Sequence, residues 1–182
     1  MNPKMVVSFL VFSITALAAV PAAAQFGVSG PSPAEVRIAK EVRHELNMLP
    51  YVTVFDYVAF QVQGSDVKLT GGVTRPVLKS DAGRVVKGIE GVQSVDNQIE
   101  VLPPSSMDDQ LRRRLYQAIY GYPPLQKYAL GVLKPIRIVV KSGRVSLEGV
   151  VDNEADKNLA YLRANGVSGA FSVTNNLQVV KP

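Results

Sequence analysis

The sequence predicts an α+β protein built from two tandem copies of one α-β-β-α-β unit. The first observation is an internal repeat: when the chain of 182 residues is shifted along itself by 78 positions, residues 62–101 align without a gap onto residues 140–179. The second is the apolar pattern inside each copy, which alternates over two strands on either side of a tight turn and then recurs at helical spacing. We therefore expect each unit to be a small three-stranded mixed sheet with two helices on one face.

The first unit is expected to span residues 33–102. Pro33 opens a helix, and an extended strand, a turn at Gly64 and Ser65 and a return strand follow. A second helix begins near Pro76, and a last strand ends at Val101. The apolar side chains that should form its core are Ile38, Val42, Leu46, Val67, Leu69, Val73, Leu78, Ala82, Val86 and Ile99.

The second unit is expected to span residues 105–181. Ser105 or Ser106 caps its first helix, and the tight turn falls at Ser142 and Gly143. A helix over residues 153–164 and a strand over residues 171–179 complete it. About five extra residues lie between its first helix and first strand, in an aromatic insertion near residues 120–135.

Residues 1–24 have the pattern of a cleaved secretory signal peptide. Lys4 precedes an apolar run of about 16 residues, which is shorter than the roughly 20 that a membrane-spanning helix needs. Small residues end the run at Ala22–Ala24, so we expect cleavage before Gln25 and no transmembrane helix afterwards. The protein is then periplasmic or secreted, which argues against nucleic acid as a partner.

The composition argues against most enzymes. The chain has no Cys and a single His, His44, so thiolate nucleophiles, zinc-thiolate sites and multi-histidine metal sites are excluded. We expect no catalytic residue, no metal and no cofactor. Asp152, Glu154 and Asp156 superficially resemble a calcium loop, but its required Gly and closing Glu are absent, so helix capping by Asp152 or Asn153 is the better interpretation. The formal charge of +5 favours anionic partners.

Two short motifs occur once in each copy. V-x-L-x-G-x-V appears at residues 67–73 and 145–151, before the second helix of each unit. G-x-x-x-V-x-N-x-(I/L)-x-V appears at residues 91–101 and 169–179, after that helix. Together, and in this order, the motifs resemble the BON domain, and the resemblance covers nearly all of the chain after residue 24. We interpret the motif glycines as structural, serving turns and close backbone approach: Gly71, Gly91, Gly149 and Gly169.

The resemblance implies a non-catalytic module that associates with membrane phospholipid or other envelope components, often in proteins linked to envelope stress. The partner is then either an anionic phospholipid surface or an envelope protein. In the second case the chain would be an adaptor that binds through its sheet faces or strand edges.

Basic and aromatic residues gather around the first helix of the second unit. A triplet of arginines is expected to fan over its exposed side, where guanidinium groups match phosphate oxygens. The alternative for the arginines is a solvated face near Asp108 and Asp109. The alternative for the tyrosines, Tyr116 included, is that their rings cover the junction between the copies and hold the insertion down. The candidate membrane or ligand contacts are Arg112, Arg113, Arg114, Tyr120, Tyr122 and Tyr128.

Overall fold

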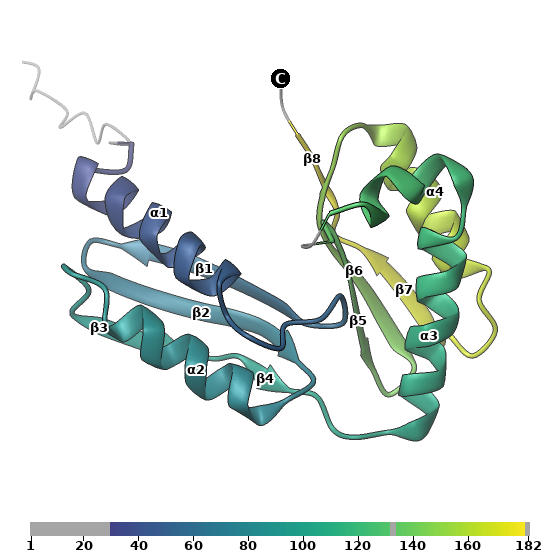
Figure 1. Cartoon of the computed structure of the whole chain (residues 1–182), viewed down its shortest axis with the longest axis horizontal. Coiled ribbons are helices and arrows are strands. Elements are labelled where there is room, and N and C mark those ends of the chain that lie inside the picture. The colour runs from purple at the N-terminus through teal and green to yellow at the C-terminus, as the bar shows by residue number, and fades with distance from the viewer. Residues whose placement is uncertain (1–29, 132–133, 181–182) are drawn as a thin grey trace, which may run out of the picture. The chain divides into compact units, whose positions relative to one another are not determined.

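The computed structural model describes residues 30–131 and 134–180, and the chain from Pro31 onward forms one compact unit. The predicted signal peptide lies outside the described residues. The predicted α+β fold with two tandem units is confirmed (Figure 1). No helix in the described part of the chain is long and apolar enough to span a membrane.

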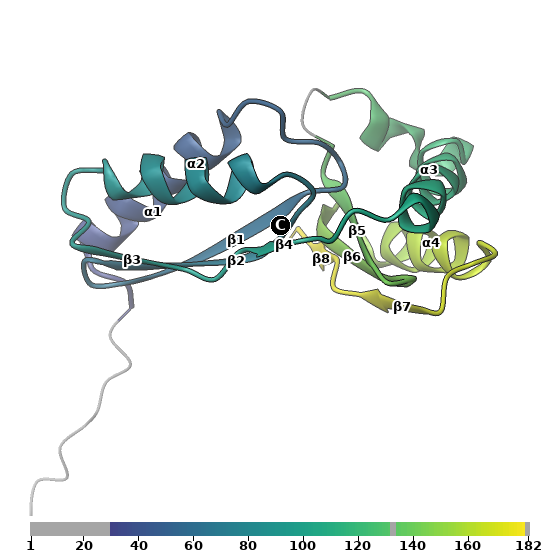
Figure 2. The same ribbon diagram turned by 90° about the horizontal axis from the view of Figure 1, so that it is seen from below.

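The first repeat places two helices on one face of its sheet (Figures 1 and 2). Strands β1 and β2 form an antiparallel hairpin, while β3 and β4 both pair parallel to β2 and act as two halves of the predicted third strand. The elements are α1 (Pro33–Asn47), β1 (Tyr57–Gln63), β2 (Asp66–Val73), α2 (Pro76–Lys87), β3 (Ser94–Asn97) and β4 (Glu100–Val101).

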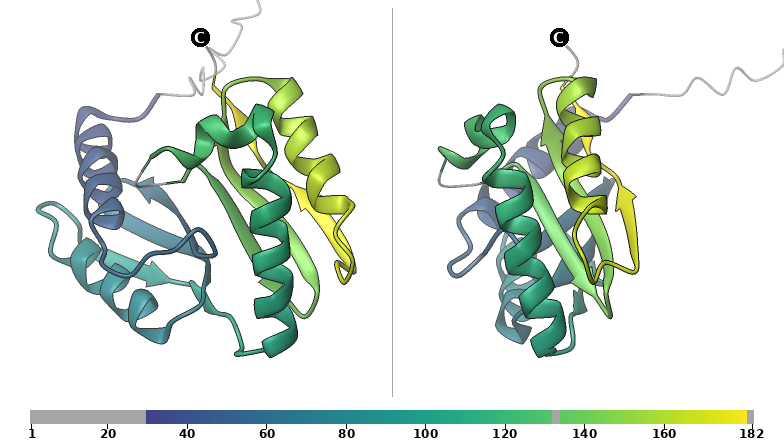
Figure 3. Two further views of the ribbon diagram at one scale, coloured as in Figure 1. Left: turned by 45° about the vertical axis from the view of Figure 1, so that its right-hand side comes forward. Right: turned by 90° about the vertical axis from the view of Figure 1, so that its right-hand side faces the viewer.

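The second repeat has the same topology, with a 3-10 helix η1 inserted after its first helix (Figure 3). The hairpin registers are equivalent, since Val58 faces Gly71 in one repeat and Ile136 faces Gly149 in the other. The elements are α3 (Ser106–Tyr120), η1 (Pro123–Ala129), β5 (Ile136–Lys141), β6 (Arg144–Val151), α4 (Glu154–Asn165), β7 (Ser172–Asn175) and β8 (Gln178–Val179).

An asparagine interrupts the third strand of each repeat. Asn97 donates its side-chain amide to the carbonyl of Lys79 in α2, at 2.7 Å, while its Oδ1 accepts the Ile99 N–H. Asn175 does the same with Lys157 in α4, at 3.1 Å, and with the N–H of Leu177. Each side chain therefore ties a strand break to the neighbouring helix, which explains why one predicted strand becomes two short ones.

The first helix of each repeat also fixes the hairpin turn. Ser32 and Ser105 are the N-caps, so the structure selects Ser105 from the two predicted candidates. Three positions on, Glu35 accepts the N–H of Gly64, and Asp108 accepts the N–H groups of the turn residues 142 and 143. The backbone donors of Gly64 and Ser32 hold the pKa of Glu35 below its ordinary value.

Each repeat has its own apolar core between the sheet and its helices. Complete burial of such a side chain contributes about 1.5–3 kcal/mol, so each core is a substantial part of the stability of a small unit. The largest fully buried side chains of the first repeat are Ile38, Leu69, Leu78 and Ile99. Those of the second are Leu111, Leu115, Ile119, Leu125, Ile136, Ile138, Leu147 and Leu177.

Candidate functional site

Arg112 does not lie on the exposed basic face that the sequence predicted. Its side chain is buried, and its Nη2 donates to the carbonyl of Val140 at 2.7 Å while its Nη1 pairs with Asp109 at 2.5 Å. The prediction that all three arginines fan over the exposed side is therefore wrong for Arg112. The reason is helical spacing: Arg112 follows the buried Leu111 by one position and borders the apolar stripe of α3.

The Arg112 contact closes part of the outer edge of strand β5. Residues of an antiparallel strand alternate between facing their partner strand and facing outward. The backbone N–H and C=O groups of Ile136, Ile138 and Val140 point away from β6, while their side chains are buried, and one of these backbone groups in each residue forms a hydrogen bond. The hydroxyl of Tyr120 donates to the Ile136 carbonyl at 2.5 Å, and the Ile138 N–H donates to the carbonyl of Val54, from the first repeat, at 2.9 Å.

Tyr120 and Tyr116 thus belong to the packing of the chain. Tyr120 is 4% exposed, and burial raises the pKa of its hydroxyl well above the ordinary value. The ring of Tyr116 meets the ring of Phe55 edge-on, with centroids 6.5 Å apart. These contacts support the interpretation that aromatic rings cover the junction between the repeats.

Tyr128 holds the insertion against the second repeat. Its hydroxyl donates to Asp156 at 2.6 Å and accepts the N–H of Asp152 at 2.8 Å, and Lys127 lies 2.7 Å from both carboxylates. Burial raises the pKa of Tyr128 to about 12. Burial alone would raise the pKa of Asp156 too, but the hydrogen bonds from Lys127 and Tyr128 outweigh it and lower that pKa. Asn153 is the N-cap of α4, so the structure selects it from the two predicted candidates, Asp152 and Asn153.

The remaining candidates keep their side chains closer to solvent. Arg113 and Arg114 are exposed, and neither forms an ion pair within the described residues. Tyr122 is half-buried, with the Arg163 guanidinium 4.8 Å from its ring centroid. The predicted contact of these three side chains with a membrane stays a prediction.

A second group of exposed side chains surrounds Arg114 at the end of the repeat where α3 begins. Met107 is 77% exposed and Phe171 is 80% exposed, although both are large and apolar. Phe171 and Arg114 line one shallow cleft with Met107, and the Arg144 guanidinium lies 5.9 Å from the Phe171 ring centroid. We call these four residues, Met107, Arg114, Arg144 and Phe171, the tip surface.

The equivalent positions of the first repeat carry acidic residues in place of the two arginines and smaller or polar residues in place of Met107 and Phe171. Alignment on the helix N-caps, 73 residues apart, places Ala34 opposite Met107 and Glu41 opposite Arg114. Alignment on the hairpins, 78 residues apart, gives the other two equivalences. In the first repeat the positions of Arg144 and Phe171 are held by Asp66 and Gln93. The tip surface is therefore specific to the second repeat.

The motif glycines lie where a side chain would collide with backbone or force strain. Gly71 and Gly149 have φ of +121° and +108°, and an added Cβ would lie 2.1 Å from the Tyr57 carbonyl oxygen or 1.9 Å from that of Pro135. Gly91 and Gly169 also have positive φ, of +90° and +94°. These geometries support the structural interpretation of all four glycines.

Asp56 forms a buried polar centre that the sequence analysis missed. The residue is 1% exposed, and its carboxylate accepts both the N–H and the hydroxyl of Thr53 and of Thr74. Four donors saturate the carboxylate, so it ties the chain before β1 to the chain before α2. In the second repeat Lys134 stands at the position of Asp56, and Tyr128 instead accepts the N–H of Asp152, the equivalent of Thr74.

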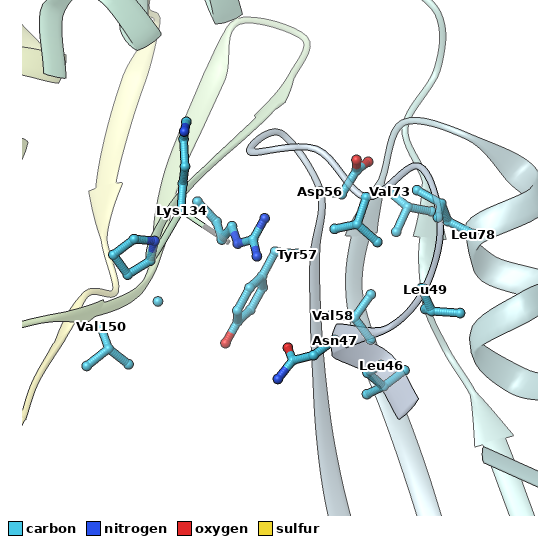
Figure 4. Close-up of a pocket in the computed structure, with 14 residues that line it drawn as sticks. Leu46, Asn47, Leu49, Asp56, Tyr57, Val58, Val73, Leu78, Lys134 and Val150 are labelled. Atoms are coloured by element: carbon cyan, nitrogen blue, oxygen red, sulfur yellow. The ribbon is translucent and has the colours of Figure 1, made fainter. Parts of the chain in front are cut away.

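A cleft of about 320 Å³ opens beside this centre (Figure 4). Its floor is apolar and includes Leu46, Leu49 and Val58, and Tyr57 projects into it. The charged groups around it are engaged with the protein: Arg137 donates to the Thr53 carbonyl and Lys134 to the Ala129 carbonyl. Asn47 and Tyr57 also line the cleft, and the acidic residue among its described lining residues is the saturated Asp56.

No group of three or more His, Asp or Glu side chains able to hold a metal occurs within residues 30–131 and 134–180. His44 is exposed on α1, between polar neighbours.

Comparison with known proteins decides the family. The sequence profile of the BON domain matches residues 34–103 and again residues 108–181. The chain belongs to the BON domain family. The two BON domains of this chain are the two repeats described above, and their elements α1 to β4 and α3 to β8 lie within the matched ranges apart from the first residues of α1 and α3.

The other comparisons add little. No curated protein matches the chain. Among solved structures, the chain is similar to the C-terminal domain of CdsD, a structural protein of the type III secretion system of Chlamydia trachomatis. The match has 13% identity, covers 80% of this chain and 98% of that one, and has a TM-score of 0.29. A second CdsD structure matches at 11% identity, 79% and 92% coverage and a TM-score of 0.29. These TM-scores are too low to support an inference.

Sequence signals for the missed residues exist at matched positions. Ser32 and Glu35, and Ser105 and Asp108, repeat the spacing of a helix cap at equivalent sites. Phe171 is an aromatic residue where the first repeat has Gln93, and such a difference within an internal repeat marks a surface that the fold does not require. Asp56 has no such signal, because its equivalent is Lys134.

Proposed function

We propose that this tandem BON protein is a non-catalytic module of the cell envelope that associates reversibly with anionic phospholipid surfaces. Family membership supports an envelope-associated module, and the predicted signal peptide supports export to the periplasm or beyond. A contribution to envelope stress responses is compatible with this setting. The specific surface is assigned to the second repeat.

The observation that carries the proposal is the tip surface. Exposed Phe171 and Met107 stand beside Arg114 and Arg144, which combines apolar side chains with guanidinium groups in one place. This is the composition that side chains need at the bilayer interface, where rings enter the headgroup region and arginines meet phosphates. The acidic group in the same cleft, Asp108, is buried and engaged by the hairpin turn.

The expected affinity is modest. A basic residue near an anionic surface contributes roughly 1 kcal/mol, so Arg114 and Arg144 together supply about 2 kcal/mol at low salt. Partial burial of Phe171 and Met107 adds on the order of 1–2 kcal/mol each. The sum supports transient association, and the charged part decreases as salt screens it.

Vesicle co-sedimentation tests the proposal. We expect the mature protein to bind vesicles that contain phosphatidylglycerol and to bind pure phosphatidylcholine vesicles hardly at all. Phe171→Ser and Met107→Ser should each weaken binding several-fold. Tyr51→Ser and Met48→Ser are matched controls, because these side chains are 68% and 69% exposed on the first repeat and should not matter. If the wild-type protein does not bind anionic vesicles, the result would favour the alternative, an envelope adaptor that binds proteins only.

A further inference from the structure

The two repeats differ at the outer edge of the first strand of the hairpin. Strands β1 and β5 are each at an end of their sheet, with β2 and β6 as their only partners in the sheet order. In the first repeat a two-residue turn follows Gln63, which pairs with Asp66. With this register the backbone N–H and C=O groups of Val58, Phe60 and Val62 point away from β2, as those of residues 136, 138 and 140 point away from β6.

The edge of β5 is already occupied. Tyr120 and Arg112 satisfy two of its outward carbonyls, and the N–H of Ile138 donates to the Val54 carbonyl. The turn over residues 53–56, in which the Thr53 carbonyl accepts the N–H of Asp56, thus lies beside β5, and Phe55 places its ring against Tyr116 of α3. The chain itself shows two contacts that are available at such an edge: one backbone hydrogen bond to the outer strand and one apolar side chain against the first helix.

The edge of β1 at Phe60 and Val62 has no such cover within the described residues. No hydrogen bond engages the outward groups of Phe60 or Val62 there. Between this edge and α1 lies a groove of about 350 Å³, and its apolar lining includes Val36, Ala39, Phe60 and Val62. Val36 is 54% exposed, which is unusual for a valine on a helix that packs on a sheet.

The charged side chains of the groove favour an acidic partner segment. Lys40 and Arg43 line it, both exposed, and neither forms an ion pair among the described residues. Glu35, the acidic residue in the lining, is committed to Ser32 and Gly64. An incoming segment therefore meets an apolar floor, unpaired backbone groups and two cations.

We propose that the β1 edge and the α1 groove bind an extended, acidic segment of a partner protein by strand addition. Backbone groups of the segment pair with Phe60 and Val62, an apolar side chain enters the groove beside Val36, and flanking carboxylates meet Lys40 and Arg43. This interaction surface is independent of the lipid surface proposed above, because it uses the other repeat.

A peptide titration followed by amide NMR tests the proposal. The probe is the acetylated peptide Glu-Val-Thr-Val-Phe-Asp-Glu, built on residues 52–56, which precede β1 and include the Val54 that bonds to β5. We expect chemical-shift changes concentrated in β1 and α1. A peptide with Lys in place of the acidic residues should bind about tenfold more weakly, and a peptide with Pro at the central position should not bind.

The protein variants give the matched comparison. Lys40→Glu with Arg43→Glu should weaken the acidic peptide about tenfold and improve binding of the Lys-flanked peptide. Lys68→Glu with Lys87→Glu, at exposed positions outside the groove, should change neither. Absence of binding, equal binding of all peptides, or shift changes confined to other elements would overturn the proposal. A stable dimer of the free protein in sedimentation equilibrium, formed by pairing of β1 with β1 of another molecule, would also overturn the proposal. The occupant of the edge would then be a second copy of this chain.

Discussion

The two repeats share the contacts that build the fold and differ in the side chains that they expose at the tip. Both have a serine-capped first helix whose third residue holds the hairpin turn, a positive-φ glycine in the second strand and an asparagine that breaks the third. Yet the first repeat has Glu41 and Gln93 where the second has Arg114 and Phe171. The shared positions explain the structure, so the positions that differ are where separate binding properties are to be sought.

The largest expected effect tests the shared positions. Gly71→Val and Gly149→Val should each destabilise the protein by roughly 2–4 kcal/mol, because a Cβ would meet a backbone carbonyl oxygen at a φ that disfavours side chains. Urea unfolding measures this. Gly88→Ala is the control: its φ is −80° and an added Cβ makes only ordinary contacts, so stability should hardly change. Wild-type stability of either valine variant would show that the repeat motif has been misread.

A substitution at Asp56 tests a buried polar contact that the first repeat has and the second repeat lacks. Asp56→Asn should cost roughly 2–3 kcal/mol, since an amide cannot accept four hydrogen bonds and leaves a buried donor unpaired. Chemical denaturation gives the number, and amide exchange locates the loss at Thr53 and Thr74. Exchange that accelerates instead around Asp152, in the repeat without this carboxylate, would contradict the assignment.

Tyr128 has the corresponding function in the second repeat and should matter less. Tyr128→Phe keeps the ring but removes the bonds to Asp156 and the Asp152 N–H, for an expected loss of about 1–2 kcal/mol. Amide exchange in α4 should rise while exchange in α2 does not. An unchanged α4 would mean that Lys127 alone holds the insertion.

Acid should affect the second repeat through Asp156. Its pKa is lowered in the folded protein, so below the ordinary value of 3.8 the unfolded chain takes up the proton first. The stabilisation is present above that pH and is lost as the pH falls toward the folded pKa. We compare the protection of the Leu147 amide against exchange at pH 7 and at pH 3. The loss of protection at pH 3 should be smaller in Asp156→Asn than in the wild type. An equal loss in both proteins would assign the acid sensitivity to other carboxylates.

Much of the fold could be predicted from the sequence because an internal repeat doubles every signal. Gly71 and Gly149, or Asn97 and Asn175, recur at the same offset, and chance does not keep such pairs in register with alternating apolar residues. The exposure of the three arginines at 112–114 could not be predicted in the same way. One position of helical rotation separates the buried Arg112 from the exposed Arg113, and the β5 carbonyl that Arg112 meets is distant in sequence.

The tip surface was not predicted for a different reason. Met107 and Phe171 are 64 residues apart, on a helix and on a loop, and each by itself would pass for a core residue. Only the packing of the repeat brings them beside Arg114 and Arg144 and leaves them uncovered. In the sequence, the difference between Phe171 and its first-repeat equivalent Gln93 is the signal that points to this surface.

Exchange of the tip residues between repeats tests the central claim, that repeats of one fold carry different surfaces and the second one meets the membrane. In one variant Met107, Arg114, Arg144 and Phe171 are replaced by their first-repeat equivalents, Ala, Glu, Asp and Gln. Co-sedimentation with phosphatidylglycerol vesicles should be lost, while circular dichroism and urea unfolding stay close to the wild type because all four positions are at the surface. Retained vesicle binding by this folded variant would contradict the account.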